Sequence, residues 1–289
     1  MKYWIAFAQA VDNKATLRVK RTLSEEELHT INACKDKISL FQGIKSLFQI
    51  TVGNYSSLKN SIGNLEKKMK EESSWNKDTV FLEINRMLVN YISTAAMFEN
   101  HAEKSIHEEY GDAAPQLISF NEQRDKEFDN HFAYRFFSEL QAFIQEKGLP
   151  KGRIKPSGES EESLPKMIYI KDSLLLPDFE WDEKVVEDFR DKPKAFDIYP
   201  DLDQNYHSLI RVYQRVLAIL AKETIKAIGT YNKLIGEFHQ EFEEEGVLVV
   251  VQGELKGDGT EKLINLPGRE IKDTIDELKR FKILKDKDS

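Results

Sequence analysis

The sequence lacks most of the features that mark secreted, membrane-spanning or disulfide-stabilised proteins. It has one cysteine, Cys34, in 289 residues, so no disulfide can form within the chain and we expect a reducing compartment. No stretch reaches the roughly 18 apolar residues that a membrane span needs. The short apolar run near the start follows no basic segment and precedes no usual cleavage site, so it is not expected to be a signal peptide. We therefore predict a cytoplasmic protein that does not enter a membrane.

An excess of positive charge is also missing. The chain has 42 lysines and arginines against 50 aspartates and glutamates, which gives a net charge of −8. A surface of this charge repels phosphate backbones on average. RNA is therefore a possible but disfavoured partner, and a local basic patch would be needed to bind it.

The common signatures of cofactor and metal sites are absent from the sequence as well. No glycine-rich loop ends in Lys-Ser or Lys-Thr, so there is no phosphate cradle of that type. Cys34 has no second cysteine with which to bind zinc, and we expect it to be an inert, partly buried thiol. His101 and His107 lie six residues apart, not the four that place two imidazoles on one face of a helix. The sequence thus predicts no metal site and no cofactor.

What the sequence does contain is a series of helical patterns between two β-hairpins. The strand-like segments "KYWIAFAQAV" and "ATLRVKRTL" flank the turn-like "DNK", which predicts a hairpin at residues 1–23 that packs on the bundle. At residues 246–289, "GVLVVVQGEL" and "EKLINL" flank "KGDGT", which predicts a second hairpin followed by a short helix from Arg269. The predicted fold class is mainly α, a helical bundle at residues 24–245 with a peripheral hairpin at each end.

The bundle is expected to begin at a capping box. Ser24 is a good N-cap residue, and Glu27 stands three positions later, where its carboxylate can bond back to the N-cap. The helical pattern continues toward Glu72. We expect two helices over this range, separated near "TVGNYSS".

Three longer helices follow from the spacing of the apolar residues. They are expected at residues 79–109, 122–147 and 201–245, and the last has the 3–4 spacing of a bundle or coiled-coil seam. Residues 150–165 are rich in proline, glycine and serine, which predicts a flexible connector. The segment "KMIYIKDSLLL" that follows is a candidate strand.

The helix at residues 79–109 has two distinct faces. Seven apolar residues fall on one side and form the expected core face: Ile84, Leu88, Tyr91, Ala95, Phe98, Ala102 and Ile106. The opposite side carries Arg86, Asn90, Met97 and His101. A polar stripe of this kind is usually solvent-exposed surface, and the alternative is that it faces a partner or a cleft.

Two of these helical segments resemble a group of uncharacterised bacterial proteins in the HEPN superfamily. They are "EINRMLVNYISTAAMFENHAEK" at residues 83–104 and "FAYRFFSELQAFIQEKGLP" at residues 132–150, and the whole resemblance spans residues 79–216. It implies an up-and-down helical bundle. Many members of the superfamily are metal-independent ribonucleases that act as toxins or anti-phage effectors, often as dimers.

The resemblance also implies where a catalytic motif would lie. Active members carry an arginine, four intervening residues and a histidine, and the helix of the similar group reads Leu-Arg-Asn-Tyr-x-Gln-His-x-Gly-Leu-Pro. This chain matches that pattern at Leu140, Gln145, Gly148, Leu149 and Pro150. Gln141 stands in place of the arginine and Glu146 in place of the histidine, so the motif is degenerate.

Both replacements remove chemistry that RNA cleavage needs. An arginine offers a charged, planar fork to the phosphate, and a histidine can move a proton near neutral pH. Gln141 has no charge, and the carboxylate of Glu146 would stand beside an anionic substrate. The sequence therefore predicts a non-catalytic protein with a binding or regulatory role, and its partner is expected to be another protein or a second copy of the chain.

Four further residues match positions typical of the group, where they line or support the cleft in active members. These candidate binding residues are Arg86, Asn90, His101 and Arg135. One alternative is a ribonuclease with a relocated site, built from His101 with Arg86 or Arg135. The other is a structural scaffold that dimerises through the helix at residues 201–245.

Overall fold

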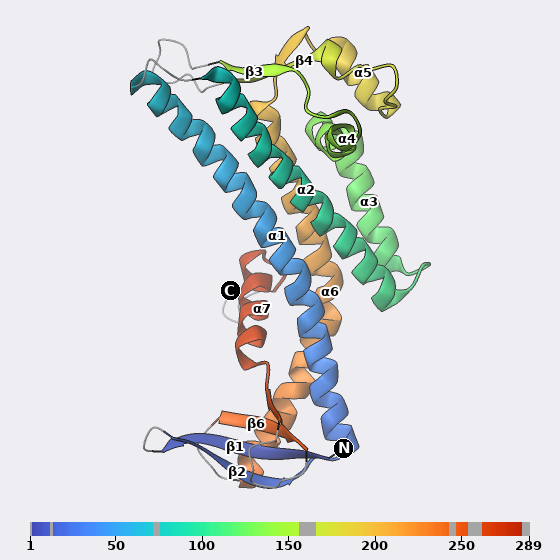
Figure 1. The fold of residues 1–289 in the computed structure, drawn as a ribbon. Coiled ribbons are helices and arrows are strands. Elements are labelled where there is room, and N and C mark those ends of the chain that lie inside the picture. Colours follow the sequence, from blue (N-terminus) through green and yellow to red (C-terminus); the bar gives the residue numbers. More distant parts are fainter. Residues whose placement is uncertain are drawn as a thin grey trace. The chain divides into compact units, whose positions relative to one another are not determined.

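The computed structural model describes residues 2–11, 14–71, 76–155, 166–242, 247–253 and 262–284. They form a mainly helical protein with two small antiparallel sheets (Figure 1). The chain divides into two compact units, residues 1–43 with 217–289 and residues 44–216. Two long helices, α1 (Glu25–Glu71) and α6 (Tyr199–Phe242), supply residues to both units. Among the helices of the described residues, none combines the length and the apolar character needed to cross a bilayer.

In the first unit, strands from the N-terminal and C-terminal parts of the sequence form one sheet. Its strands are β1 (Tyr3–Val11), β2 (Lys14–Thr22), β6 (Val247–Gln252) and β7 (Lys262–Asn265). Both predicted hairpins are confirmed, and the strand order β2-β1-β6-β7 shows that they share a sheet, which the sequence analysis did not predict (Figure 1). Ile5 lies opposite Val250 in this junction. The predicted turn residues 12–13 and 254–261 lie outside the described residues.

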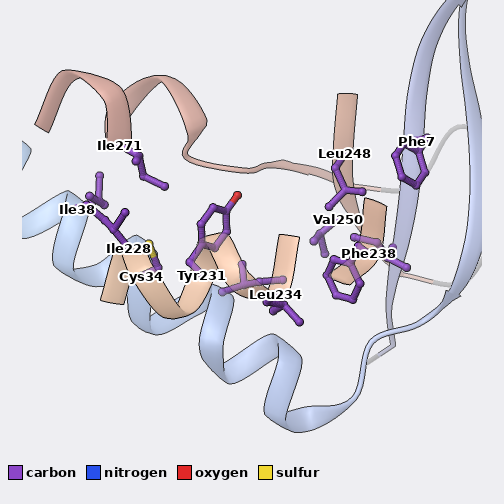
Figure 2. Packing of buried hydrophobic residues seen from close by; sticks show 12 residues of the cluster. Phe7, Cys34, Ile38, Ile228, Tyr231, Leu234, Phe238, Leu248, Val250 and Ile271 are labelled. Carbon is purple, nitrogen blue, oxygen red and sulfur yellow. The ribbon is translucent and has the colours of Figure 1, made fainter. Parts of the chain in front are cut away.

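One face of this sheet packs on a hydrophobic core. Side chains of β1 and β6 pack with those of α1, α6 and the C-terminal helix α7 (Gly268–Arg280), as Figure 2 shows around Tyr231 and Phe238. Cys34 is fully buried in this cluster, and burial raises the pKa of its thiol to about 11. The thiol is therefore protonated near neutral pH, as expected of an inert cysteine.

The predicted capping box starts α1. The Ser24 N–H donates to the Glu27 carboxylate at 2.7 Å, and the Glu27 N–H donates to the Ser24 hydroxyl at 3.2 Å. Arg21 on β2 adds a second connection, because its guanidinium binds Glu27 at 2.8 Å and Glu241 of α6 at 2.9 Å. These ion pairs link the sheet to both long helices within the first unit.

We predict that Glu27→Gln reduces the dependence of stability on acid pH. The hydrogen bond from Arg21, with further bonds from Ser24, lowers the pKa of Glu27 to about 2 from its ordinary value of 4.5. A carboxylate with a lowered pKa contributes stability above its unfolded-state pKa, and that contribution is lost as the pH falls toward 2. The variant should be less stable at pH 7, and its stability should fall less steeply between pH 4.5 and 2, as measured by urea denaturation.

Glu26→Gln is the matched control, because Glu26 lies in the same helical turn with an exposed side chain. It should keep the pH dependence of the parent protein. Equal pH dependence in the Glu27→Gln variant and the parent would contradict a stabilising ion pair at this position.

The second unit contains the remaining helices and the smaller sheet. Its elements besides the adjoining parts of α1 and α6 are α2 (Lys77–Tyr110), α3 (Pro115–Asn130), α4 (Phe132–Lys147), β3 (Gly152–Lys155), β4 (Lys166–Ile170), a 3-10 turn η1 (Lys171–Ser173), α5 (Glu183–Asp191) and β5 (Ala195–Asp197). The three strands form an antiparallel sheet in the order β3-β4-β5. The predicted boundaries after residues 23 and 245 both fall inside the first unit.

The expected interruption of α1 near "TVGNYSS" was wrong, because the helix is continuous. The Thr51 hydroxyl bonds back to the Leu47 carbonyl at 3.0 Å and the side chain is fully buried. Tyr55 stacks on Tyr206 of α6 with ring centroids 4.0 Å apart, and its hydroxyl donates to Asp203 at 2.5 Å. Tertiary packing therefore outweighs the weak helix propensity of this segment.

The single helix predicted at residues 122–147 was also wrong. The segment forms two helices, α3 and α4, which meet at His131 in an extended conformation with φ −132° and ψ 108°. The buried Arg135 side chain explains why this break is stable. Its Nη1 donates to the carbonyls of Phe128 and, at 2.9 Å, Asp129, which have no helical partners at the end of α3.

Part of the segment predicted as a flexible connector, residues 150–165, has regular secondary structure. Residues 152–155 form strand β3, which pairs with β4 and confirms the candidate strand at "KMIYI". Gly152 is required there, since a Cβ atom would lie 2.3 Å from the Ile168 carbonyl oxygen. Residues 156–165 lie outside the described residues, and the sequence analysis did not predict α5 or β5.

The predicted core face of α2 is confirmed, since all seven of its residues are buried. The 3–4 seam of the last long helix is also confirmed as apolar packing, because Leu209, Leu217 and Leu234 of α6 are buried within the chain. This seam therefore gives no support to a dimer interface through α6.

We predict that Phe136→Ala lowers the free energy of unfolding by about 3–5 kcal/mol, the usual range for a buried phenylalanine. Phe136 is fully buried on α4, and its ring lies among those of Phe132, Trp181 and Phe189. Urea denaturation would measure the loss. Ile118→Ala is the control at an exposed helical position, and a change under about 1 kcal/mol for Phe136→Ala would contradict the core assignment.

Candidate functional site

Helix α4 places the two degenerate motif positions at two different cavities. Residues five apart are separated by about 140° around a helix. Gln141 lines a cavity of about 180 Å³ with side chains of α2, α3 and α6. Glu146 lines a second cavity, of about 550 Å³, with residues of the segment between η1 and α5. The two side chains therefore do not lie in one site within a single chain.

The cavity at Glu146 is acidic. It is lined by Glu139, Ala142, Glu146, Pro177, Asp178, Phe179, Glu180 and Asp182, and none of these described residues is basic. Burial raises the pKa of Glu139, while an ion pair with Lys147 at 2.8 Å lowers the pKa of Asp178. This concentration of carboxyl groups repels an anionic ligand.

The cavity at Gln141 contains a buried carboxyl group. Glu99 of α2 is 7% exposed and accepts a hydrogen bond from the Tyr134 hydroxyl of α4. Burial raises the pKa of Glu99, although the nearby positive charge of Arg124 opposes this shift. Burial acts against the charge of Arg124 as well, but Glu99, Tyr134 and Glu103 outweigh it and raise the pKa of the guanidinium. The side wall of the cavity therefore combines a cation with a carboxyl group whose charge is disfavoured.

The floor of the same cavity comes from α6. Asn205 is buried, and its side-chain oxygen accepts from the Tyr91 hydroxyl at 2.6 Å. Leu209 lies one turn further along α6 and is also buried. The mouth is formed by more accessible residues, among them Asn100 and Ser138, with Gln141 half-buried beside them.

Three of the candidate binding residues lie on the exposed face of α2. Arg86 is paired with Glu83 at 2.6 Å on the helix surface, and this partner raises the pKa of Arg86. The Asn90 and His101 side chains are exposed. The described residues that line the two cavities around Gln141 and Glu146 include none of these three.

The fourth candidate, Arg135, is buried and bonded within the protein. Its Nε and Nη2 donate to Asp188 of α5 at 3.0 and 2.8 Å. Its Nη1 donates to the two carbonyls at the end of α3 described above. The side chain thus connects α3, α4 and α5, and four of its five N–H groups donate to described residues.

We predict that Arg135→Ala lowers the free energy of unfolding by about 3–5 kcal/mol, the cost of removing one partner of a buried ion pair. His101→Ala should change it by less than about 0.5 kcal/mol, because an exposed side chain contributes little. Urea denaturation of both variants gives the comparison. Equal, small effects would show that Arg135 does not hold the α3–α4–α5 junction.

The sequence analysis did not identify Glu99, Arg124 or Asn205 as site residues. One signal was available for Glu99: at 100° per residue it falls within about 20° of the core face of α2, where a carboxylate is unusual. Arg124 and Asn205 have no comparable signal, because their proximity to Glu99 depends on how α3 and α6 pack. Among the described residues, no three side chains of His, Cys, Asp or Glu are grouped as metal ligands would be.

Comparisons of the chain with protein-family models, curated proteins and solved structures found no match. The resemblance to HEPN proteins accordingly stays a prediction. A function has to be inferred from the chemistry of the residues described above.

Proposed function

We propose that this chain is a non-catalytic, HEPN-like binding protein with a regulatory role, of the kind found in phage-defence or toxin–antitoxin systems. The observation that carries the proposal is the environment of Gln141 and Glu146. The position expected for an arginine holds a neutral amide, and the position expected for a histidine holds a carboxylate in an acidic cavity.

The chemistry of RNA cleavage supports this inference. A metal-independent ribonuclease must take a proton from the 2′-hydroxyl and stabilise the negative charge that develops on the phosphate. Glu146 could accept a proton, but the carboxylates of Glu139, Glu180 and Asp182 around it would repel the phosphate. The proposal therefore assigns binding, without RNA cleavage, to this chain.

The alternative function, a ribonuclease with a relocated site, has little support in the geometry of the arginine contacts. Arg135 directs four of its five N–H groups to partners inside the protein, and Arg86 is paired with Glu83. In a relocated site, His101 would therefore have to act without a free arginine to bind the phosphate.

We predict that the purified protein does not cleave total RNA or tRNA, with or without divalent metal ions, because the positions of the catalytic pair hold neither a cation nor an imidazole. Gel electrophoresis of the RNA would measure the outcome, with an active metal-independent ribonuclease as the positive control. Cleavage that persists through purification and disappears in His101→Ala would contradict the proposal and favour the relocated site.

The partner surface that we propose is the exposed stripe of α2. Leu82 and Met97 are 59% and 54% exposed, and they lie on the same side of the helix as Arg86, Asn90 and His101. An exposed mixture of apolar, amide and basic side chains is typical of the surface that a protein partner covers. The partner is another protein or a second copy of this chain.

We predict a homodimer at micromolar concentration that uses this stripe. Light scattering should give twice the mass of one chain for the parent protein. Met97→Lys should give a folded monomer, since Met97 is exposed, whereas Leu217→Lys at a buried position should unfold the chain. A single-chain mass for the parent would exclude the dimer and leave a different protein as the partner.

A further inference from the structure

The lining of the Gln141 cavity combines hydrogen-bonding groups with hydrocarbon, and α2 and α6 each contribute both kinds. Water can satisfy the polar groups, but it finds no hydrogen-bond partners among the apolar side chains. A molecule with one polar edge and one apolar edge would complement such a lining.

The polar part of the lining offers a donor group and an acceptor to a ligand. Asn205 accepts from Tyr91 through Oδ1, and its side-chain amide nitrogen is a donor. Glu99 accepts from Tyr134 through Oε1, and Oε2 is a second acceptor. Arg124 Nε has no partner among the described residues, but almost none of its surface is accessible, so Arg124 acts on a ligand through its charge. A ligand that pairs with Asn205 and Glu99 is favoured, because polar groups at a largely buried site are costly when they are left unpaired.

The apolar part of the lining consists of four side chains of three helices. They are Ile92 and Ala95 of α2, Phe137 of α4 and Leu209 of α6, and all four are buried. Such a wall favours the hydrocarbon part of a ring or a short chain over water.

The charges of the cavity favour a neutral ligand. Glu99 and Arg124 lie near enough for each to shift the pKa of the other. Arg124 is further neutralised by Glu103, whose carboxylate lies 2.7 Å from Nη1. An anion would approach two carboxyl groups and a cation would approach the guanidinium, so either charge is opposed.

The volume limits the size of the ligand. The cavity holds about 180 Å³. An apolar cavity of about 150 Å³ accommodates benzene. The space therefore suits one six-membered ring with a single exocyclic atom.

We propose that this cavity binds a small, neutral cyclic amide, a six-membered ring in which an N–H group stands beside a carbonyl. The N–H donates to Glu99, and the carbonyl oxygen accepts from the Asn205 amide. The hydrocarbon edge of the ring packs against Phe137 and Leu209. Gln141 lies at the mouth, where its amide can bond to a substituent that extends toward solvent. This inference goes beyond the proposed function, because it requires neither a protein partner nor the HEPN resemblance.

The experiment compares two probes that differ by one methyl group. 2-Pyridone has the required N–H and carbonyl, whereas N-methyl-2-pyridone has the same ring and carbonyl without the N–H donor. Titration of the full-length protein by two-dimensional NMR should show saturable binding of 2-pyridone at millimolar concentration. N-methyl-2-pyridone should bind roughly tenfold or more weakly, because the buried Glu99 acceptor would be left unpaired.

Replacing either of two alanine residues by phenylalanine tests where 2-pyridone binds. Ala96→Phe fills the cavity from α2 without removing a hydrogen-bonding group, and it should abolish 2-pyridone binding. Ala142→Phe is the matched control, since Ala142 is exposed and lines the acidic cavity instead, and it should leave the affinity unchanged. The dispersion of the NMR spectrum shows whether each variant is folded.

Three results would overturn the inference. The first is no saturable binding of 2-pyridone to the parent protein, which would mean that water alone occupies the cavity. The second is equal affinity for the two probes. The third is 2-pyridone binding that a folded Ala96→Phe variant retains. The ribonuclease assay is independent of all three, so either proposal can fail without the other.

Discussion

The packing of aromatic rings between α1, α2 and α6 is the interaction on which the helical unit depends. Phe48 of α1 stacks on Tyr213 of α6 with ring centroids 3.9 Å apart, and Phe98 of α2 meets both rings. Further along the same helices, Tyr55 stacks on Tyr206. Since large rings bury much apolar area and pack in only a few orientations, these contacts fix the rotation of each helix about its axis.

That rotation determines what the neighbouring polar residues can do. Because Phe98 points into the core, the adjacent Glu99 lies at the edge of the core. There it accepts a hydrogen bond from the Tyr134 hydroxyl. The buried Tyr91–Asn205 bond likewise links α2 to α6 at the floor of the cavity. Polar groups inside a core are costly unless they are paired, so a cavity lined by partly paired groups has to be held by the packing around it.

The sequence predicted the elements best where one periodicity or one local interaction decides the structure. The capping box at Ser24, the core face of α2 and the two terminal hairpins all depend on neighbours close in sequence. It failed where distant contacts decide. Thr51 and Tyr55 lie in a weak helical segment that packing on α6 keeps helical, and Arg135 stabilises a break that the apolar pattern does not reveal. The joining of β1 to β6 is also a long-range event, because the strands lie at opposite ends of the chain.

The candidate site was only partly predictable for the same reason. The motif comparison directed attention to α4 and treated Gln141 and Glu146 as one site, whereas the helix turns them toward separate cavities. The residues that give the Gln141 cavity its chemistry come from three other helical positions, Glu99, Arg124 and Asn205. No spacing along the chain relates them, and only the packed bundle brings them to the same cavity.

The claim that the partner of this chain is a protein and not RNA can be tested most directly by the affinity for RNA and its salt dependence. Fluorescence anisotropy of a labelled single-stranded RNA would be followed against protein concentration at low and at physiological ionic strength. The net charge of −8 and the acidic cavity at Glu146 predict no saturable binding at either salt concentration. Saturable binding whose logarithm falls linearly with the logarithm of the salt concentration would show that several phosphates are neutralised on the protein, and it would contradict the account.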